Sequence, residues 1–490
     1  MPAPTRRAAD AAPQPKPAPP VLELRGTTFT YEGAARPSAE DVTLSVAAGE
    51  CVVLCGESGC GKTTVTRLAN GLAGEFYEGE RRGEVRVGGA PLQSLSQWEV
   101  AERVGSVFQN PRTQFFNLDT TGEIAFGMEN LAVPRAEMHA RMASTARELG
   151  IEALLDRNIF ALSGGQKQAV AFAGAHACRP AAYVLDEPSS NLDPAAMDDL
   201  ARLIRTAKQR GAAVLVAEHR LAYLADAADR FIFMRAGRVE REWTAEAFAA
   251  LSAEERGRLG LRSPHPPVLS ELEARLAARA SAAPACEARG LVAEYERGRA
   301  VLDGCTMAFD AGSVTGITGP NGAGKSTLLS CLCGLKRERM GHVRFAGEVV
   351  PPRRRADRAF LVMQDPDYQL FRESVRAELS CAPRAPDAAD TARIDELLAR
   401  FDLADVADRH PATLSGGQKQ RVVCAMAALS PADVLLFDEP TSGLDHAGMR
   451  RLARLMRELA RDGRAVAVVS HDTEFLACAC HRIVRLEPGR

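Results

Sequence analysis

The 490-residue chain lacks any apolar run of 18 or more residues, so the sequence predicts no membrane-spanning helix. Residues 1–20 are rich in Ala and Pro without a hydrophobic core segment, which excludes a secretory signal and predicts a short disordered tail. The formal net charge is only -2, which argues against a basic nucleic-acid-binding surface over the whole protein. We therefore expect a soluble cytosolic protein of several domains.

Lysine is scarce, and cysteine occurs without the spacing of a metal site. Only seven lysines stand among 61 basic residues, and four of the seven lie inside the motifs described below. No Cys-x-x-Cys pair occurs among the 12 cysteines, which argues against a zinc site or a disulfide framework. The one-residue spacing of Cys331/Cys333 and Cys478/Cys480 suits alternation on a strand, and we expect the cysteines to be small buried hydrophobes.

The chain repeats itself with a period of about 250 residues. Leu162–Gln168 reads LSGGQKQ and returns as Leu414–Gln420, while the Asp-Glu-Pro at Asp186 returns at Asp438. A period of this length indicates a duplicated domain rather than a solenoid. The predicted organisation is a tail (1–20), a first domain (21–241), a linker with one helix, Leu269–Ala280 (242–285), and a second domain (286–490).

Continuous apolar segments alternate with helical patterns in each copy. Such segments suit strands that are buried on both faces of a largely parallel sheet, and their alternation with helices predicts an α/β fold. The predicted strands are Cys51–Cys55, Ala182–Leu185, Ala213–Ala217, Ser313–Ile317, Val434–Phe437 and Ala465–Val469.

A glycine-rich loop follows the first of these strands in each copy. Both loops fit G-x-x-x-x-G-K-[ST], in which backbone N–H groups and the following helix N-terminus surround phosphates. Lys62 and Lys325 would reach the β- and γ-phosphates, and the hydroxyls of Thr63 and Ser326 would bind Mg²⁺. The predicted nucleotide-binding residues are Gly56, Glu57, Ser58, Gly59, Cys60, Gly61, Lys62, Thr63 and Thr64, with Gly319, Pro320, Asn321, Gly322, Ala323, Gly324, Lys325, Ser326 and Thr327.

An Asp-Glu pair ends a later strand in each copy. Asp186 and Asp438 can hold Mg²⁺, while the next residues, Glu187 and Glu439, can polarise an attacking water. His219 and His471 end the following strands at equal distances from these pairs, which favours contact with the γ-phosphate over a purely structural role.

With these residues the chain resembles the nucleotide-binding subunits of ATP-binding cassette (ABC) proteins, with two cassettes in tandem. The LSGGQ strings resemble the cassette signature, Gln109 and Gln364 resemble the lid-loop glutamine that contacts the metal, and Tyr31 and Tyr295 stand where the family stacks an aromatic ring on adenine. The resemblance implies cassettes that each contain a largely parallel core sheet flanked by helices, a helical signature subdomain and an antiparallel β subdomain.

The family pairs its cassettes head to tail, which implies two composite ATP sites within this chain. Site one would combine Gly56–Thr63, Gln109, Asp186, Glu187 and His219 with Ser415, Gly416, Gly417 and Gln418. Site two would combine Gly319–Ser326, Gln364, Asp438, Glu439 and His471 with Ser163, Gly164, Gly165 and Gln166. ATP and Mg²⁺ are the expected ligands, and both sites keep their glutamate, although Ala169 stands where the second copy has Arg421.

The residues after the lid-loop glutamine narrow the resemblance. Gln109–Phe116 and Gln364–Phe371 both read Q-[ND]-P-x-x-Q-x-F, which is similar to the ATPases of energy-coupling factor (ECF) importers of vitamins and transition-metal ions. That resemblance implies a peripheral protein on the cytoplasmic face of the cell membrane, with a transmembrane coupling protein and a separate substrate-binding membrane protein as partners. Two alternatives are a soluble tandem ABC factor acting on ribosomes or other nucleoprotein and a sugar importer ATPase. The first usually carries a long charged arm and the second a degenerate site.

Overall fold

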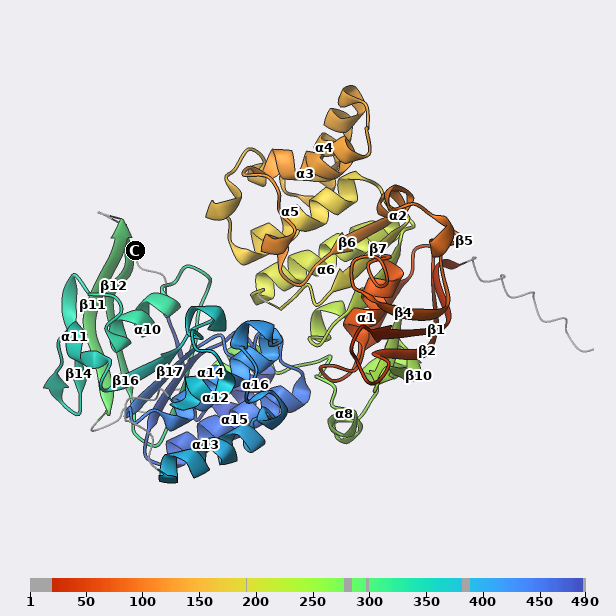
Figure 1. The fold of residues 1–490 in the computed structure, drawn as a ribbon. Coiled ribbons are helices and arrows are strands. Elements are labelled where there is room, and N and C mark those ends of the chain that lie inside the picture. The colour runs from red at the N-terminus through yellow and green to blue at the C-terminus, as the bar shows by residue number, and fades with distance from the viewer. Residues whose placement is uncertain (1–19, 191, 277–283, 297–298, 381–387, 488–490) are drawn as a thin grey trace, which may run out of the picture.

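The computed structural model describes residues 20–190, 192–276, 284–296, 299–380 and 388–487, which form two α/β cassettes beside one another (Figure 1). Each cassette has a core sheet, a separate antiparallel sheet and a group of helices. The predicted α/β tandem-cassette fold is confirmed. The predicted tail lies outside the described residues except for Pro20, which is the first residue of β1.

The core sheet of the first cassette has strand order β10-β9-β3-β8-β7-β6, and all neighbours are parallel except β10 and β9. Its strands are β3 (Cys51–Cys55), β6 (Val104–Val107), β7 (Ala182–Asp186), β8 (Ala213–Ala217), β9 (Arg230–Arg235) and β10 (Arg238–Thr244).

The core sheet of the second cassette has order β16-β17-β18-β13-β19 and is parallel throughout. Its strands are β13 (Val314–Thr318), β16 (Ala359–Val362), β17 (Val434–Asp438), β18 (Ala465–Val469) and β19 (Arg482–Arg485).

Antiparallel sheets and helices complete each cassette. The sheets comprise β1 (Pro20–Tyr31), β2 (Ala39–Ala47), β4 (Gly79–Val87) and β5 (Ala90–Pro91), and then β11 (Cys286–Glu296), β12 (Arg299–Phe309), β14 (Met340–Phe345) and β15 (Glu348–Val349). The first cassette has helices α1 (Lys62–Ala69), α2 (Gln97–Arg103), α3 (Thr120–Asn130), α4 (Arg135–Leu149), α5 (Gly164–Ala177) and α6 (Pro194–Gln209). The second has α10 (Lys325–Cys333), α11 (Pro352–Arg355), α12 (Val375–Ser380), α13 (Ala388–Arg400), α14 (Gly416–Leu429), α15 (His446–Arg461) and α16 (Thr473–Ala479).

Strand β3 illustrates why these apolar segments form the centre of each sheet. All five of its residues are buried, and successive side chains point to opposite faces. Cys51, Val53 and Cys55 pack with the core beneath α3–α6, whereas Val52 and Leu54 pack with α1 and the antiparallel sheet. A sheet covered on both faces requires strands without polar alternation, which explains the continuous apolar runs.

Two cysteine pairs lie in a different setting from the one expected. Cys331 and Cys333 belong to helix α10, and Cys478 belongs to α16, which Cys480 directly follows. The expectation of strands was wrong because a short apolar run such as Leu328–Cys333 has no periodicity that separates a strand from a buried helix.

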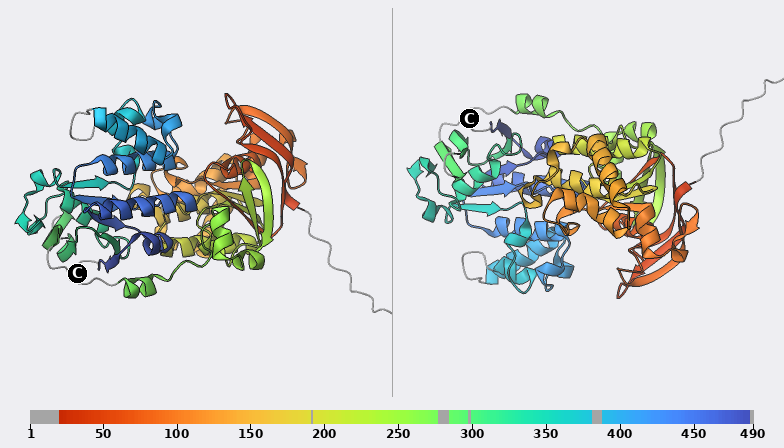
Figure 2. Two further views of the ribbon diagram at one scale, coloured as in Figure 1. Left: turned by 90° about the horizontal axis from the view of Figure 1, so that it is seen from below. Right: turned by 90° about the horizontal axis from the view of Figure 1, so that it is seen from above.

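The predicted linker begins inside β10 and contains three short helices, whereas the sequence indicated one. These are α7 (Ala245–Ala249), α8 (Ala253–Leu259) and α9 (Leu269–Arg275). Leu259 and Leu261 pack into the core of the first cassette, and Leu272 packs into that of the second. The linker thus connects the two cassettes along one edge of the molecule (Figure 2). Within the described ranges, every helix is too short or too polar to cross a bilayer.

Candidate nucleotide sites between the cassettes

The glycine-rich loops join β3 to α1 and β13 to α10, where backbone geometry demands glycine. Gly56 has φ 147° and Gly319 has φ 139°. A Cβ at Gly56 would lie 2.3 Å from the Met234 carbonyl oxygen, and one at Gly319 would lie 2.3 Å from that of Leu486. Only glycine allows the loop to lie this close to the next strand, so the loop curves around the start of the helix.

The two loop lysines are buried and lie inside their own loops. Lys62 Nζ donates to the carbonyl oxygens of Gly56 and Glu57, both at 3.1 Å, and lies 3.3 Å from His219 Nε2. Lys325 Nζ donates to those of Gly319 at 2.8 Å and Pro320 at 3.1 Å. Both ammonium groups therefore stand next to the backbone N–H groups that the sequence predicts for phosphate binding.

The predicted residues of the first copy form two polar groups through the adjacent Asp186 and Glu187. Thr63 Oγ1 donates to Asp186 Oδ1 at 3.1 Å, and Gln109 Nε2 donates to Glu187 Oε2 at 2.9 Å. The other carboxylate oxygen of Glu187 lies 3.2 Å from His219 Nε2. Glu187 has φ 43°, a left-handed conformation that turns the chain sharply after β7 and is matched by Glu439 with φ 46°.

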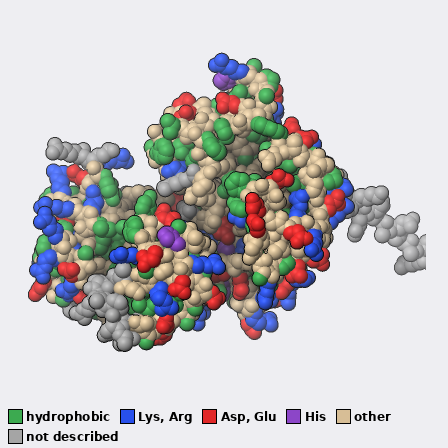
Figure 3. Space-filling view, viewed as in Figure 1, with side chains coloured by type: hydrophobic (Ala, Val, Ile, Leu, Met, Phe, Trp, Pro, Cys, Tyr) green, Lys and Arg blue, Asp and Glu red, His purple; other side chains and the backbone are tan. Residues whose placement is uncertain are grey.

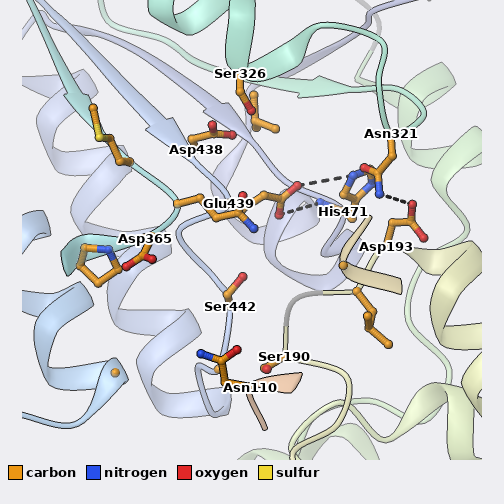
Figure 4. A pocket seen from close by; sticks show the side chains of 18 of the residues that line it. Asn110, Ser190, Asp193, Asn321, Ser326, Asp365, Asp438, Glu439, Ser442 and His471 are labelled. Atoms are coloured by element: carbon orange, nitrogen blue, oxygen red, sulfur yellow. Dashed lines mark hydrogen bonds and ion pairs between the residues drawn. The ribbon is translucent and has the colours of Figure 1, made fainter. Parts of the chain in front are cut away.

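The second copy contains the same residues, but several of their polar atoms have no hydrogen-bond partner. Glu439 Oε1 lies 3.5 Å from His471 Nε2, beyond good hydrogen-bond distance (Figure 4). Among the described residues, Asp438 Oδ1, Glu439 Oε1 and His471 Nε2 are buried without a hydrogen-bond partner. Buried unpaired carboxylate oxygens of this kind are suited to bind Mg²⁺ or a water molecule. The Ser326 hydroxyl and the Gln364 amide could complete such a site.

The pKa values of the carboxyl groups differ between the copies. Burial raises the pKa of Glu439 to about 7, and burial together with Glu187 raises that of Asp186 to about 6. Burial acts to raise the pKa of Glu187 as well, but the hydrogen bond from His219 and the charges of His219 and Lys62 together outweigh it, so this pKa lies below its usual value. Burial and the charge of Lys325 lower the pKa of His471 to about 4, so this imidazole is neutral at pH 7.

A cavity of about 870 Å³ lies between the cassettes (Figures 3 and 4). The second cassette contributes its glycine-rich loop, Gln364, Asp438, Glu439 and His471 to the wall. The first contributes the start of its signature helix, including Gly164. Part of the set predicted for site two therefore meets in one cavity, where Gly164 is the one predicted signature residue of the first cassette. Gly416, Gly417 and Gln109, all predicted for site one, line the same cavity, whereas the loop Gly56–Thr63 does not.

The two signature helices begin in the same way. Ser163 caps α5 and Ser415 caps α14, each in a reciprocal capping box with Gln166 or Gln418. The serine oxygens accept from these glutamine N–H groups at 3.3 Å, which leaves the N–H groups of the two intervening glycines at the helix start. Such a terminus is an anion-binding element.

Two acidic loops connect the cassettes directly, and the sequence did not single them out as contacts. We call Leu192–Asp193 and Leu444–Asp445 the first and second aspartate loops. The Asn321 amide donates to the carboxylate of Asp193 (Figure 4), and the Ser58 N–H donates to Asp445 Oδ2 at 2.8 Å. Each aspartate thus contacts the glycine-rich loop of the other cassette. Their recurrence at the repeat offset was the available signal.

The two predicted adenine-stacking tyrosines have different surroundings. Tyr295 is 67% exposed, and Lys336 Nζ lies 3.7 Å from its ring centre. The Tyr31 hydroxyl accepts from Arg67 Nη1 at 3.0 Å and lies 3.3 Å from Thr64 Oγ1. Both hydroxyls therefore lie near a threonine of the following helix, at 3.3 Å for Tyr31 and 3.5 Å for Tyr295, and the surroundings differ in exposure and in the cation beside each ring.

Two tandem α/β cassettes, each with a glycine-rich loop before a helix and an Asp-Glu pair at the end of a core strand, define a nucleotide-binding ATPase. The sequence model of the ABC transporter family matches residues 39–190 and 302–442. The chain belongs to this family and is a tandem ABC transporter ATP-binding protein with ATPase activity.

Individual relatives agree with this assignment. A putative ABC transporter ATP-binding protein of Treponema denticola is 40% identical over 96% of both chains. A putative HMP/thiamine import ATP-binding protein of Bacillus subtilis is 31% identical over 93% of this chain and 88% of its own. The structure titled RNase-L Inhibitor superposes with a TM-score of 0.62 at 22% identity, covering 94% of this chain and 90% of that one, and supports the fold alone.

Proposed function

We propose that this protein binds and hydrolyses ATP at two composite sites to energise an ECF-type importer of vitamins or transition-metal ions. Its partners would be a transmembrane coupling protein and a separate substrate-binding membrane protein, which would hold the ATPase at the cytoplasmic face of the membrane. The observation that carries this proposal is the lid loop, which is built in the same way in both cassettes and exposes a phenylalanine in each. The import role in the name of the Bacillus subtilis relative supports the same class of substrate.

The second glutamine of each lid motif holds the loop from inside. Gln114 accepts from the Phe108 N–H at 3.4 Å and donates to the Ser106 carbonyl oxygen at 3.1 Å. Gln369 makes the equivalent bonds to Met363 and Leu361, both at 2.7 Å. These glutamines pair the backbone groups where the chain leaves β6 and β16, so they shape the loop rather than contact nucleotide.

A glutamate fixes the end of each loop and leaves an aromatic side chain on the surface. Glu123 accepts from the Phe116 N–H at 3.0 Å, and Glu378 accepts from the Phe371 N–H. Phe116 is 75% exposed and Phe371 is 77% exposed. Hydrophobic side chains gather over α3 and α5 on the face seen in Figure 3. A firmly held loop that presents apolar surface is suited to a protein partner.

Each residue of the site has a part in the proposed reaction. Loop N–H groups and Lys62 or Lys325 would bind the β- and γ-phosphates, and the opposing signature helix would bind the γ-phosphate from the other side. Mg²⁺ would be held by Thr63 or Ser326 with Asp186 or Asp438, and would neutralise phosphate charge. Glu187 and Glu439 would accept a proton from the attacking water, while His219 and His471 would orient the γ-phosphate.

Replacing both exposed phenylalanines tests the membrane partnership. We expect the double variant Phe116→Asp, Phe371→Asp to lose recovery of membrane proteins in a tagged pull-down from detergent-solubilised membranes, because a charge on each surface cannot be buried unpaired. Val349→Asp, at an exposed position in β15, is the matched control and should keep the partners. The parent protein and the control are expected to recover one polytopic membrane protein and a small substrate-binding membrane protein. Recovery with ribosomal proteins instead would overturn the importer proposal and favour the ribosome alternative.

The two sites should differ in their dependence on pH. With Glu187→Gln only site two can turn over, and its Glu439, with a pKa of about 7, is protonated at lower pH and becomes a base as pH rises. With Glu439→Gln only site one remains, and Glu187 has a lowered pKa and stays ionised at lower pH. In the pH profile of the phosphate-release rate, we therefore expect the acidic limb of Glu187→Gln to lie at higher pH than that of Glu439→Gln. Coincident limbs would contradict this assignment.

A further inference from the structure

The residue that follows the strand-end histidine, His219 or His471, differs in charge between the two cassettes. Arg220 follows His219 in the first cassette, whereas Asp472 follows His471 in the second. Arg220 Nη1 donates to the Leu192 carbonyl oxygen at 3.4 Å, so this guanidinium supports the first aspartate loop from within its own cassette. An aspartate at position 472 has no hydrogen to donate to the equivalent carbonyl, that of Leu444.

The linker supplies the guanidinium that the second cassette lacks. Arg262 is only 5% exposed and forms an ion pair with Asp472. Its Nη1 donates to the Leu444 carbonyl oxygen at 3.2 Å, and its Nε donates to Glu474 Oε2 at 3.0 Å. A planar guanidinium holds its donors in fixed directions and can reach three acceptors at once. The ammonium group of lysine has no such fixed geometry. Arg262 thus occupies the position toward the second aspartate loop that Arg220 occupies toward the first.

The same short stretch of linker also contacts the first cassette. Leu259 and Leu261 are buried in its core, and Gly260 between them has φ 68°. A Cβ at Gly260 would lie 2.8 Å from Glu57 Oε1, so the linker backbone lies directly against the first glycine-rich loop. Residues 259–262 therefore contact both partners of site one, the first loop through Gly260 and the second aspartate loop through Arg262.

The supported loop is the one that reaches across to site one. Asp445 directly follows Leu444, and its carboxylate accepts from the Ser58 N–H at 2.8 Å. We propose that Arg262 is a positioning residue for ATP hydrolysis at site one, and that the linker holds the second aspartate loop against the first glycine-rich loop. This inference rests on the proposed function for the identity of the two sites. The described part of the linker makes no hydrogen bond or ion pair with the aspartate loop of site two, and the guanidinium that donates to that loop belongs to Arg220 of the first cassette.

Single-site backgrounds separate this role from a general effect on folding. In the Glu439→Gln background, where only site one turns over, we expect Arg262→Gln to lower the rate of phosphate release about tenfold, less than the ~100-fold that a ~1 Å misplacement can cost. In the Glu187→Gln background the same change should leave site two within about twofold. A folding defect of the second cassette would lower site two as well, because that cassette supplies its glycine-rich loop. Equal losses at both sites, or no loss at site one, would overturn the proposal.

Arg220→Gln is the mirror control, since Asp193 contacts Asn321 in site two. We expect it to slow site two more than site one. Hydrogen exchange followed by mass spectrometry gives a readout without turnover: Arg262→Gln should speed exchange in residues 443–446 and at Ser58, and Arg220→Gln should not. If the single glutamate variants keep full activity, the proposed catalytic roles fail, whereas the exchange experiment still decides the role of Arg262. Unchanged exchange in Arg262→Gln would overturn it.

Discussion

Replacing both site glutamates, Glu187→Gln with Glu439→Gln, is expected to lower the ATPase rate by about 10³-fold, because a positioned general base contributes roughly 10²–10⁴-fold. Each glutamate directly follows a core strand in a left-handed backbone conformation and lies beside a histidine of its own cassette. Glutamine keeps the side-chain volume but cannot accept a proton from water. Phosphate release measures the rate, and equilibrium dialysis with ATP should show that binding is kept.

The exposed Glu271 in α9 provides a matched control, since Glu271→Gln makes the same chemical change away from both sites. This control should retain the parent rate. A double glutamate variant with a rate near that of the parent would show that another group accepts the proton. A variant that loses both turnover and ATP binding would point instead to a loss of site structure.

Gly56→Ala is expected to abolish ATP binding at site one and to lower the free energy of unfolding by about 3 kcal/mol or more. The added methyl group would overlap the Met234 backbone oxygen, at 2.3 Å, and would also meet the Cys60 sulfur at 2.8 Å. Met234 belongs to a strand that is paired on both sides, so its carbonyl cannot easily move aside and the loop itself must shift. Thermal unfolding and ATP binding in the Glu439→Gln background measure the two effects.

Gly59→Ala in the same loop is the control that separates steric overlap from the cost of a positive φ. Gly59 also has a positive φ, 78°, but a Cβ there meets no atom within 4 Å. Its substitution should cost only the conformational penalty of about 1–2 kcal/mol. If the two variants unfold at the same temperature, the close approach of the loop to Met234 is not what requires glycine at position 56.

Several features were open to prediction because they depend on local chemistry. Strands β3, β7 and β8 and their counterparts were predicted because a strand covered on both faces must be apolar along its length. The helix starts at Ser163 and Ser415 follow from the serine-to-glutamine spacing of a capping box. The short helices of the linker were harder to predict, because one or two helical turns contain too few residues to show a clear hydrophobic periodicity.

The sequence by itself determined the duplication, the α/β class, the family and the candidate residues of the nucleotide sites, because each of these depends on residue types at short spacings. Tertiary structure alone decided how the two site glutamates differ. Glu439 and Glu187 are the same residue in the same motif, yet burial raises the pKa of Glu439, whereas in Glu187 the neighbouring His219 and Lys62 together outweigh burial and lower the pKa. Likewise, no local pattern links Arg262 to Leu444, because the contact joins segments about 180 residues apart. Such contacts arise only when the whole chain packs, and they determine which site the linker supports.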